Sequence, residues 1–190
     1  MVFPNLHLAD ENFVKIIPAG GDIHFEETKE GGEGVSVFKA VGQALQLRVH
    51  DRPPLVWALK NKKCADGAFL TFSEKTGGYT LHILEMKSKI TVDEFCKVLE
   101  QFKGMYFSAI SMMSVLRMPA PSDVRFYISY KRCAIEESSP VLLKQLTGVK
   151  SSLGLSSWVS ETVHLPFEIQ GKLIKGVRVD GKNCDFGTIH

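Results

Sequence analysis

Apolar residues recur along the chain at two spacings, which predict its helices and strands. In residues 35–49 they lie three and four positions apart, which predicts an amphipathic helix. Residues 51–54, with two prolines, end that helix. The compact apolar run at residues 55–59 then predicts a buried strand.

Residues 64–89 predict two strands joined by a tight turn. Gly77 and Gly78 are the turn residues, because glycine adopts the backbone angles of a short hairpin turn without steric cost. Asp66 begins the first predicted strand, and Glu85, Met86 and Lys87 end the second. The two strands therefore carry acidic residues that pairing could bring together.

A second, longer helix is predicted after residue 89. Thr91 followed three residues later by Glu94 has the pattern of a capping box, and apolar residues continue at helical spacing to Met113. The helix would make about seven turns if it reached Arg117. Prolines 119 and 121 end it, and residues 124–130, VRFYISY, predict another strand.

The two flanks of this region have weaker patterns. Residues 1–34 predict an initial strand or turn followed by an exposed Gly-rich, acidic loop. Residues 131–163 predict a short helix near 141–146 within Ser-rich loops, and residues 167–179 predict a hairpin at a sheet edge. We expect one α/β domain, 1–190, with a core at about 35–131 and decorations at 1–34 and 132–190.

Composition narrows the class of protein. Of the 190 residues, 44% are hydrophobic and 23% charged, as in soluble globular proteins, and the net charge of +2 excludes nucleic-acid binding by overall charge alone. The four cysteines are widely spaced, which predicts reduced thiols and a cytoplasmic protein rather than a zinc site or disulfide framework. We expect no targeting segment and no membrane-spanning run.

The candidate chemistry lies on the two predicted strands. Asp66, Glu85 and the backbone carbonyl of Met86 offer the oxygen ligands that Mg²⁺ or Mn²⁺ requires for phosphodiester hydrolysis. Lys87 follows Glu85 by two residues, so it projects from the same strand face and could orient water or stabilise a phosphate. The alternative is a surface ion pair of Glu85 with Lys87 and a turn aspartate at 66, but the apolar residues before Glu85 predict a buried strand.

These residues, and the order helix, strand, strand, strand, helix, strand, resemble the core of the PD-(D/E)xK nuclease superfamily. Asp66 matches the family's aspartate, and Glu85 with Lys87 matches its Glu-x-Lys, with eighteen residues between Asp66 and Glu85. Ala65 stands where the family name has proline. The resemblance covers about half the chain and implies a restriction-endonuclease-like fold, a mixed sheet flanked by helices, and Mg²⁺-dependent or Mn²⁺-dependent cleavage of DNA or RNA.

The resemblance also suggests accessory residues. Some members add an acid from the first helix and a glutamine or tyrosine from the second, so Glu33, Gln43 and Gln101 are further candidates. The ordinary polarity of helix surfaces explains them as well.

Basic residues cluster near the predicted strand ends. They would grip nucleic-acid phosphates, or they would protect the sheet ends from aggregation. These residues are Lys60, Lys62, Lys63, Lys89, Lys131 and Arg132.

Two functions follow from the sequence. The first is a metal-dependent nuclease that acts through Asp66, Glu85 and Lys87. The second is a catalytically silent module of the same fold that binds a protein or nucleic acid, which the near-neutral charge and the lack of a recognisable DNA-reading helix favour. In either case a chain of this size leaves target choice to a homodimer or a protein partner.

Overall fold

Strands dominate the structure. The computed structural model describes residues 2–28, 32–48, 63–135 and 149–190. In chain order the elements are a short 3₁₀ helix (Leu6–Leu8), β1 (Val14–Ile17), β2 (Asp22–Glu27), β3 (Gly34–Ala40), β4 (Ala44–Arg48), β5 (Gly67–Ser73), β6 (Gly78–Ile90), α1 (Val92–Val115), β7 (Asp123–Cys133), α3 (Val149–Ser160), β8 (Thr162–His164), β9 (Gln170–Val177) and β10 (Asn183–Ile189).

Strand β6 is the centre of a seven-stranded mixed sheet with the order β1-β4-β5-β6-β7-β9-β8. Neighbours β4, β5 and β6 are antiparallel, whereas β7 runs parallel to both β6 and β9. Helix α1 connects β6 to β7, because parallel neighbours require a crossover. The described residues therefore form an α/β fold with a mixed sheet.

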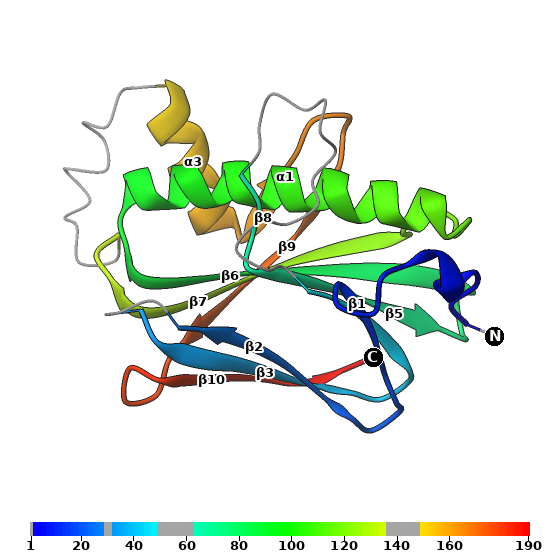
Figure 1. The fold of residues 1–190 in the computed structure, drawn as a ribbon. Coiled ribbons are helices and arrows are strands. Elements are labelled where there is room, and N and C mark those ends of the chain that lie inside the picture. The colour runs from blue at the N-terminus through cyan, green and yellow to red at the C-terminus, as the bar shows by residue number, and fades with distance from the viewer. Residues whose placement is uncertain (1, 29–31, 49–62, 136–148) are drawn as a thin grey trace.

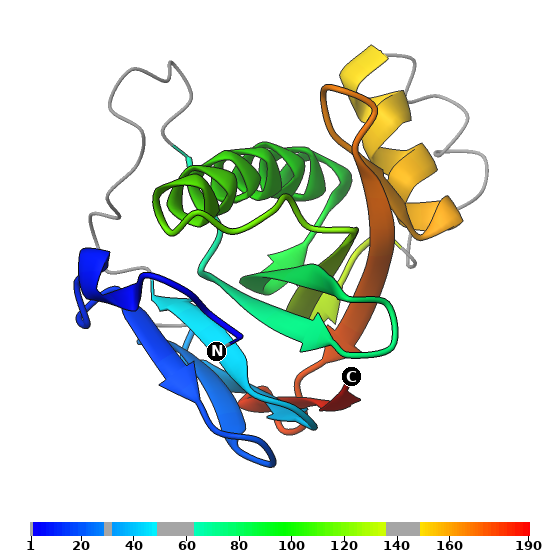
Figure 2. The ribbon, with the colours of Figure 1, turned by 90° about the vertical axis from the view of Figure 1, so that its right-hand side faces the viewer.

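Both faces of this sheet are covered. Helices α1 and α3 lie over one face, and a smaller sheet, β10-β3-β2, lies against the other (Figures 1 and 2). Side chains of β6 project to both faces of the sheet. Leu81 and Ile83 pack toward the helices, and Leu84 and Met86 pack between the sheets. A polar side chain in the middle of β6 is thus enclosed by apolar neighbours.

Helix α1 begins as the sequence predicts. The Thr91 hydroxyl accepts a hydrogen bond from the Glu94 amide at 3.2 Å, which satisfies one of the free amides at the helix start. The helix ends at Val115, and Asn5 Nδ2 donates to the Leu116 carbonyl at 3.0 Å. The capped helix is confirmed, two residues shorter at its carboxyl end than the predicted limit.

The predicted strand pair and the following strand are also confirmed. Gly77 has φ +65° in the turn, and Gly78 already belongs to β6. Strand β6 continues to Ile90, so Glu85 and Lys87 lie within it and not at its end. Strand β7 starts one residue before the predicted segment 124–130 and ends three residues after it.

The predicted helix at residues 35–49 is wrong: this segment forms β3 and β4. Residues Ser36, Phe38 and Ala40 are buried in alternation, which is the two-residue period of a strand. Because one of the buried residues, Ser36, is polar, a pattern of hydrophobic residues does not reveal that alternation. Strand β3 pairs with β2, so a strand also occupies part of the predicted Gly-rich loop.

The carboxyl-terminal prediction needs a correction as well. Residues 167–179 do not form a hairpin by themselves; β9 is one strand, and its antiparallel partner at the sheet edge is β8. Helix α3 was not predicted. The predicted strand at 55–59 and short helix near 141–146 lie outside the described residues. In the part of the chain that the structure describes, no helix combines the length and apolar character needed to span a bilayer.

Candidate functional site

Asp66 and Glu85 are adjacent because of the register between β5 and β6. Gly67 pairs with Leu84, which places Asp66 opposite Glu85. The Asp66 amide donates to Glu85 Oε2 at 3.2 Å, and the Met86 amide donates to Asp66 Oδ2 at 2.6 Å. Each carboxylate is therefore held by the backbone of the other strand.

Lys87 and Gln101 both donate to the same oxygen of Glu85. The Lys87 ammonium forms an ion pair with Glu85 Oε1, and Gln101 Nε2 donates to that atom at 2.7 Å. Glu85 faces the helix layer, as Ile83 does two residues earlier, and this brings it to Gln101 of α1. The structure thus brings together Asp66, Glu85, Lys87 and Gln101, from two strands and one helix.

Two acidic groups share the site with one ammonium group. Burial and the neighbouring charge of Asp66 raise the pKa of Glu85 to about 8, against the opposing effects of Lys87 and Gln101. Burial acts to lower the pKa of Lys87, but Glu85 and Asp66 outweigh it, so that pKa is raised overall. Two carboxyl groups beside one ammonium explain why both shifts are upward, and a cation placed between the acids would offset their mutual repulsion.

The oxygen donors fit a hard divalent cation. Glu85 is only 1% exposed, and its Oε2 accepts one hydrogen bond from the described residues, which leaves a lone pair of that oxygen for another partner. Magnesium is commonly held by one or two carboxylates with water completing its shell. Among the described residues, no group of three or more His, Cys, Asp or Glu side chains is arranged to hold a metal, so water and the Met86 carbonyl would have to supply the remaining ligands.

Several of the predicted basic residues surround this end of the sheet. Lys63 is exposed three residues before Asp66, and Lys89 pairs in register with Arg132 on β7, both exposed. Lys131 is half-buried, with its Nζ 3.8 Å from Glu33 Oε2. Glu33 thus lies beside Lys131, and Lys60 and Lys62 lie outside the described residues.

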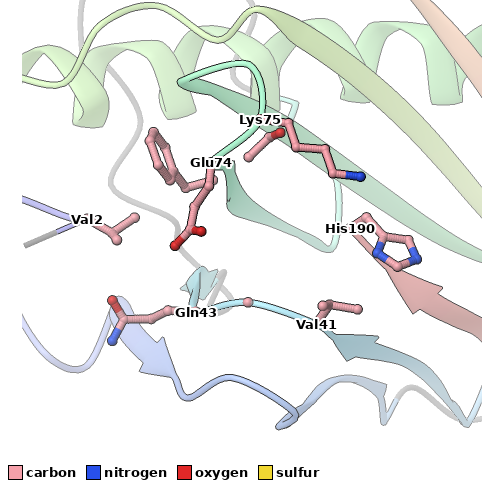
Figure 3. Close-up of a pocket in the computed structure, with 9 residues that line it drawn as sticks. Val2, Val41, Gln43, Glu74, Lys75 and His190 are labelled. Carbon is pink, nitrogen blue, oxygen red and sulfur yellow. The ribbon is translucent and has the colours of Figure 1, made fainter.

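Gln43 lies far from the acids, and its predicted role in the site is wrong. It precedes Ala44, which pairs with Thr71 near the opposite end of β5 from Asp66, about 17 Å away at 3.4 Å per residue. There it lines a separate pocket of about 410 Å³, with Glu74 and Lys75 on one side and Gln43, Val41 and His190 on the other (Figure 3). The error follows from the incorrect helix at 35–49.

Arg178 is a buried charge that sequence reasoning missed. It is 3% exposed, its Nη1 donates to the Gly32 carbonyl at 2.5 Å and its Nε donates to Ser129 Oγ at 3.4 Å. Burial lowers its pKa, while the charges of Asp66 and Glu27 act to raise it. The alternating pattern of residues 167–179 contains no signal that distinguishes this arginine from an exposed strand residue.

A scan against protein-family models, a search of curated proteins and a search of solved structures each found nothing that matches the chain. The functional argument accordingly rests on the contacts among Asp66, Glu85, Lys87 and Gln101.

Proposed function

We propose that the protein is a metal-dependent phosphodiesterase that cleaves DNA or RNA, with a restriction-endonuclease-like core. The observation that carries the proposal is the convergence of Asp66, Lys87 and Gln101 on one buried carboxylate, Glu85. The strand order supports it, since three antiparallel strands, a helix and a parallel strand follow one another from β4 to β7. The helix expected before them is replaced by β3.

Each residue has a role that its position supports. Asp66 Oδ2 and Glu85 Oε2, with the Met86 carbonyl, would hold Mg²⁺ or Mn²⁺. When bound, the ion would polarise a phosphoryl oxygen and lower the pKa of attacking water. Lys87, 22% exposed, has an ammonium that can donate to that water or to the phosphate as negative charge develops. Gln101 holds the Glu85 carboxylate in place.

Hydrolysis then needs one bond made and one broken. Water oxygen attacks phosphorus and loses a proton to solvent, the bond from phosphorus to the leaving oxygen breaks, and that oxygen takes a proton from solvent. Lys63, Lys89 and Arg132 would bind flanking phosphates, since all three are exposed near the acids.

Cleavage of plasmid DNA and of RNA in Mg²⁺, Mn²⁺ or EDTA tests the proposal. We expect activity with either metal, none in EDTA, and losses of about 100-fold or more in Asp66→Asn, Glu85→Gln and Lys87→Ala. Glu74→Ala and Lys75→Ala are matched controls, because these exposed residues lie at the other end of the same strand pair. Cleavage that survives EDTA, or that the three site variants retain, refutes the assignment.

The burial of Glu85 favours one alternative. A carboxylate that is 1% exposed and already bonded by Lys87 and Gln101 also suits a silent module in which the set only shapes a binding surface. Binding of nucleic acid without cleavage in any metal, unchanged in Glu85→Gln, is the result that would select it.

A further inference from the structure

The backbone that leads into Asp66 lies directly against helix α1 at Gly104. A methyl group on Gly104 would be 2.9 Å from the Lys63 carbonyl carbon, closer still to its oxygen, and 3.7 Å from the Cys64 amide nitrogen. The contacts with the Lys63 carbonyl group are shorter than real Cβ atoms make, whereas the contact with the Cys64 nitrogen is an ordinary one. Only glycine therefore allows the Lys63–Cys64 backbone to approach the helix this closely.

Two neighbours of Gly104 also hold the same segment. Gln101 Nε2 lies 3.4 Å from the Cys64 carbonyl oxygen, and Met105 Sδ lies 3.6 Å from Cys64 Sγ. Residues 101, 104 and 105 share one side of the helix, because they are three and four positions apart. We call these three residues the α1 contact face.

The α1 contact face connects both acids of the site. Gln101 donates to Glu85 Oε1, whereas the α1 contact face as a whole packs against Cys64, two residues before Asp66. The separation between the acids thus depends on how closely the chain at residues 63 and 64 approaches the helix. Helix formation does not account for Gly104, since alanine is the better helix former.

We propose that Gly104 is a positioning residue for Asp66. Because Gly104 has no side chain, residues 63 and 64 can pack directly against α1. In that position Asp66 Oδ2 accepts from the Met86 amide, and the Asp66 amide donates to Glu85 Oε2. The consequence for metal binding rests on the proposed function. The consequence for the position of Asp66 does not.

The substitution Gly104→Ala tests the proposal. The added methyl group would meet backbone atoms, which cannot rotate away as a flexible side chain can, so the helix and the segment must separate. Displacements near 1 Å cost about 100-fold in rate, and loss of supporting contacts around a metal site typically costs about 10- to 100-fold in affinity. We therefore expect the Mg²⁺ concentration for half-maximal cleavage to rise at least about tenfold.

The first readout is the amide resonances of Asp66 and Met86 in the metal-free protein. We expect both to shift in Gly104→Ala, because their hydrogen bonds to carboxylates lengthen, and to stay in place in Gly42→Ala, where an added methyl meets nothing within 4 Å. If Gly104→Ala does not fold, the variant Met105→Leu tests the positioning role in its place. This variant keeps the volume, removes the sulfur contact with Cys64, and should move the same two resonances less.

The outcomes separate the two claims. Wild-type protein that cleaves nothing in any metal overturns the proposed function, while the amide shifts still support the positioning role. Unmoved Asp66 and Met86 amides in folded Gly104→Ala, or in Met105→Leu where the first variant does not fold, overturn the positioning role even if cleavage is observed. An unchanged metal requirement in an active, folded Gly104→Ala overturns the consequence for metal binding.

Discussion

The buried imidazole of His82 should make the stability of the protein depend on pH. His82 is fully buried, with Nε2 3.0 Å from Thr71 Oγ1 and Nδ1 3.0 Å from the Tyr127 hydroxyl. Its ring stacks on Phe69 with centroids 4.3 Å apart. Burial, with a smaller effect from the positive charge of Arg125, lowers the His82 pKa well below its ordinary value of 6.5.

The sign follows from proton binding in the two states. Below pH 6.5 the unfolded chain binds a proton at His82 that the folded protein does not, so stability is present above this pH and is lost as pH falls. The contribution of His82 to stability changes little between pH 8 and pH 6.5, and below pH 6.5 its slope approaches about 1.4 kcal/mol per pH unit. The total loss between pH 8 and pH 5 is therefore about 2 kcal/mol. Glu85 acts in the opposite direction, because its raised pKa favours the folded state as pH falls below about 8.

Comparison with His82→Gln isolates the histidine. The contribution of Glu85 is common to both proteins and cancels in the difference between their free energies of unfolding. We expect the stability cost of His82→Gln, measured by urea unfolding, to be about 2 kcal/mol smaller at pH 5 than at pH 8. Tryptophan fluorescence, to which the 3% exposed Trp158 contributes, and circular dichroism should give the same transition. A cost that stays constant from pH 5 to pH 8 refutes the reasoning.

Two other substitutions have defined outcomes. Gln101→Ala removes a donor to Glu85, and cleavage should fall about 10- to 100-fold while exposed Glu100→Ala leaves it unchanged; equal effects of the two would remove Gln101 from the site. Gly67→Ala places a methyl group against the ring of Phe25 between the two sheets, and urea unfolding should show a loss of about 1–3 kcal/mol as that ring shifts. An unchanged unfolding midpoint for Gly67→Ala would contradict the close packing of the layers.

The parts of the fold that could be predicted are those determined by neighbours in sequence. A turn at Gly77 joins β5 to β6, and a cap at Thr91 starts α1, so short-range patterns suffice for both. The smaller sheet is different, because β3 pairs in parallel with β10, almost at the other end of the chain. Apolar residues at 37, 38, 41, 44 and 45 fit a helix as well as two strands, and the pairing of these strands with other segments decides between them.

The candidate site divides in the same way. Asp66 and Glu85 meet because a single hairpin register places them opposite each other, which spacing and turn chemistry predict. To place Gln101 in the site, one must know which side of α1 faces the sheet. The sequence pattern does not distinguish Gln101 from the other polar residues of the helix surface. Arg178 and Gly104 depend on contacts between segments distant in the chain, for which hydrophobic periodicity carries no signal.

The arrangement around Glu85 is difficult to explain by stability alone. Removing a carboxylate from water costs several kcal/mol, and a buried ion pair is often replaced by apolar residues without loss of stability. Here the neighbouring acid Asp66 adds repulsion to that cost, as the raised pKa of Glu85 indicates. Strand β6 offers apolar neighbours on both faces, so an apolar side chain at position 85 would meet no such penalty. Perturbed acids of this kind concentrate at functional sites, and a cation between Asp66 and Glu85 would turn their repulsion into binding energy.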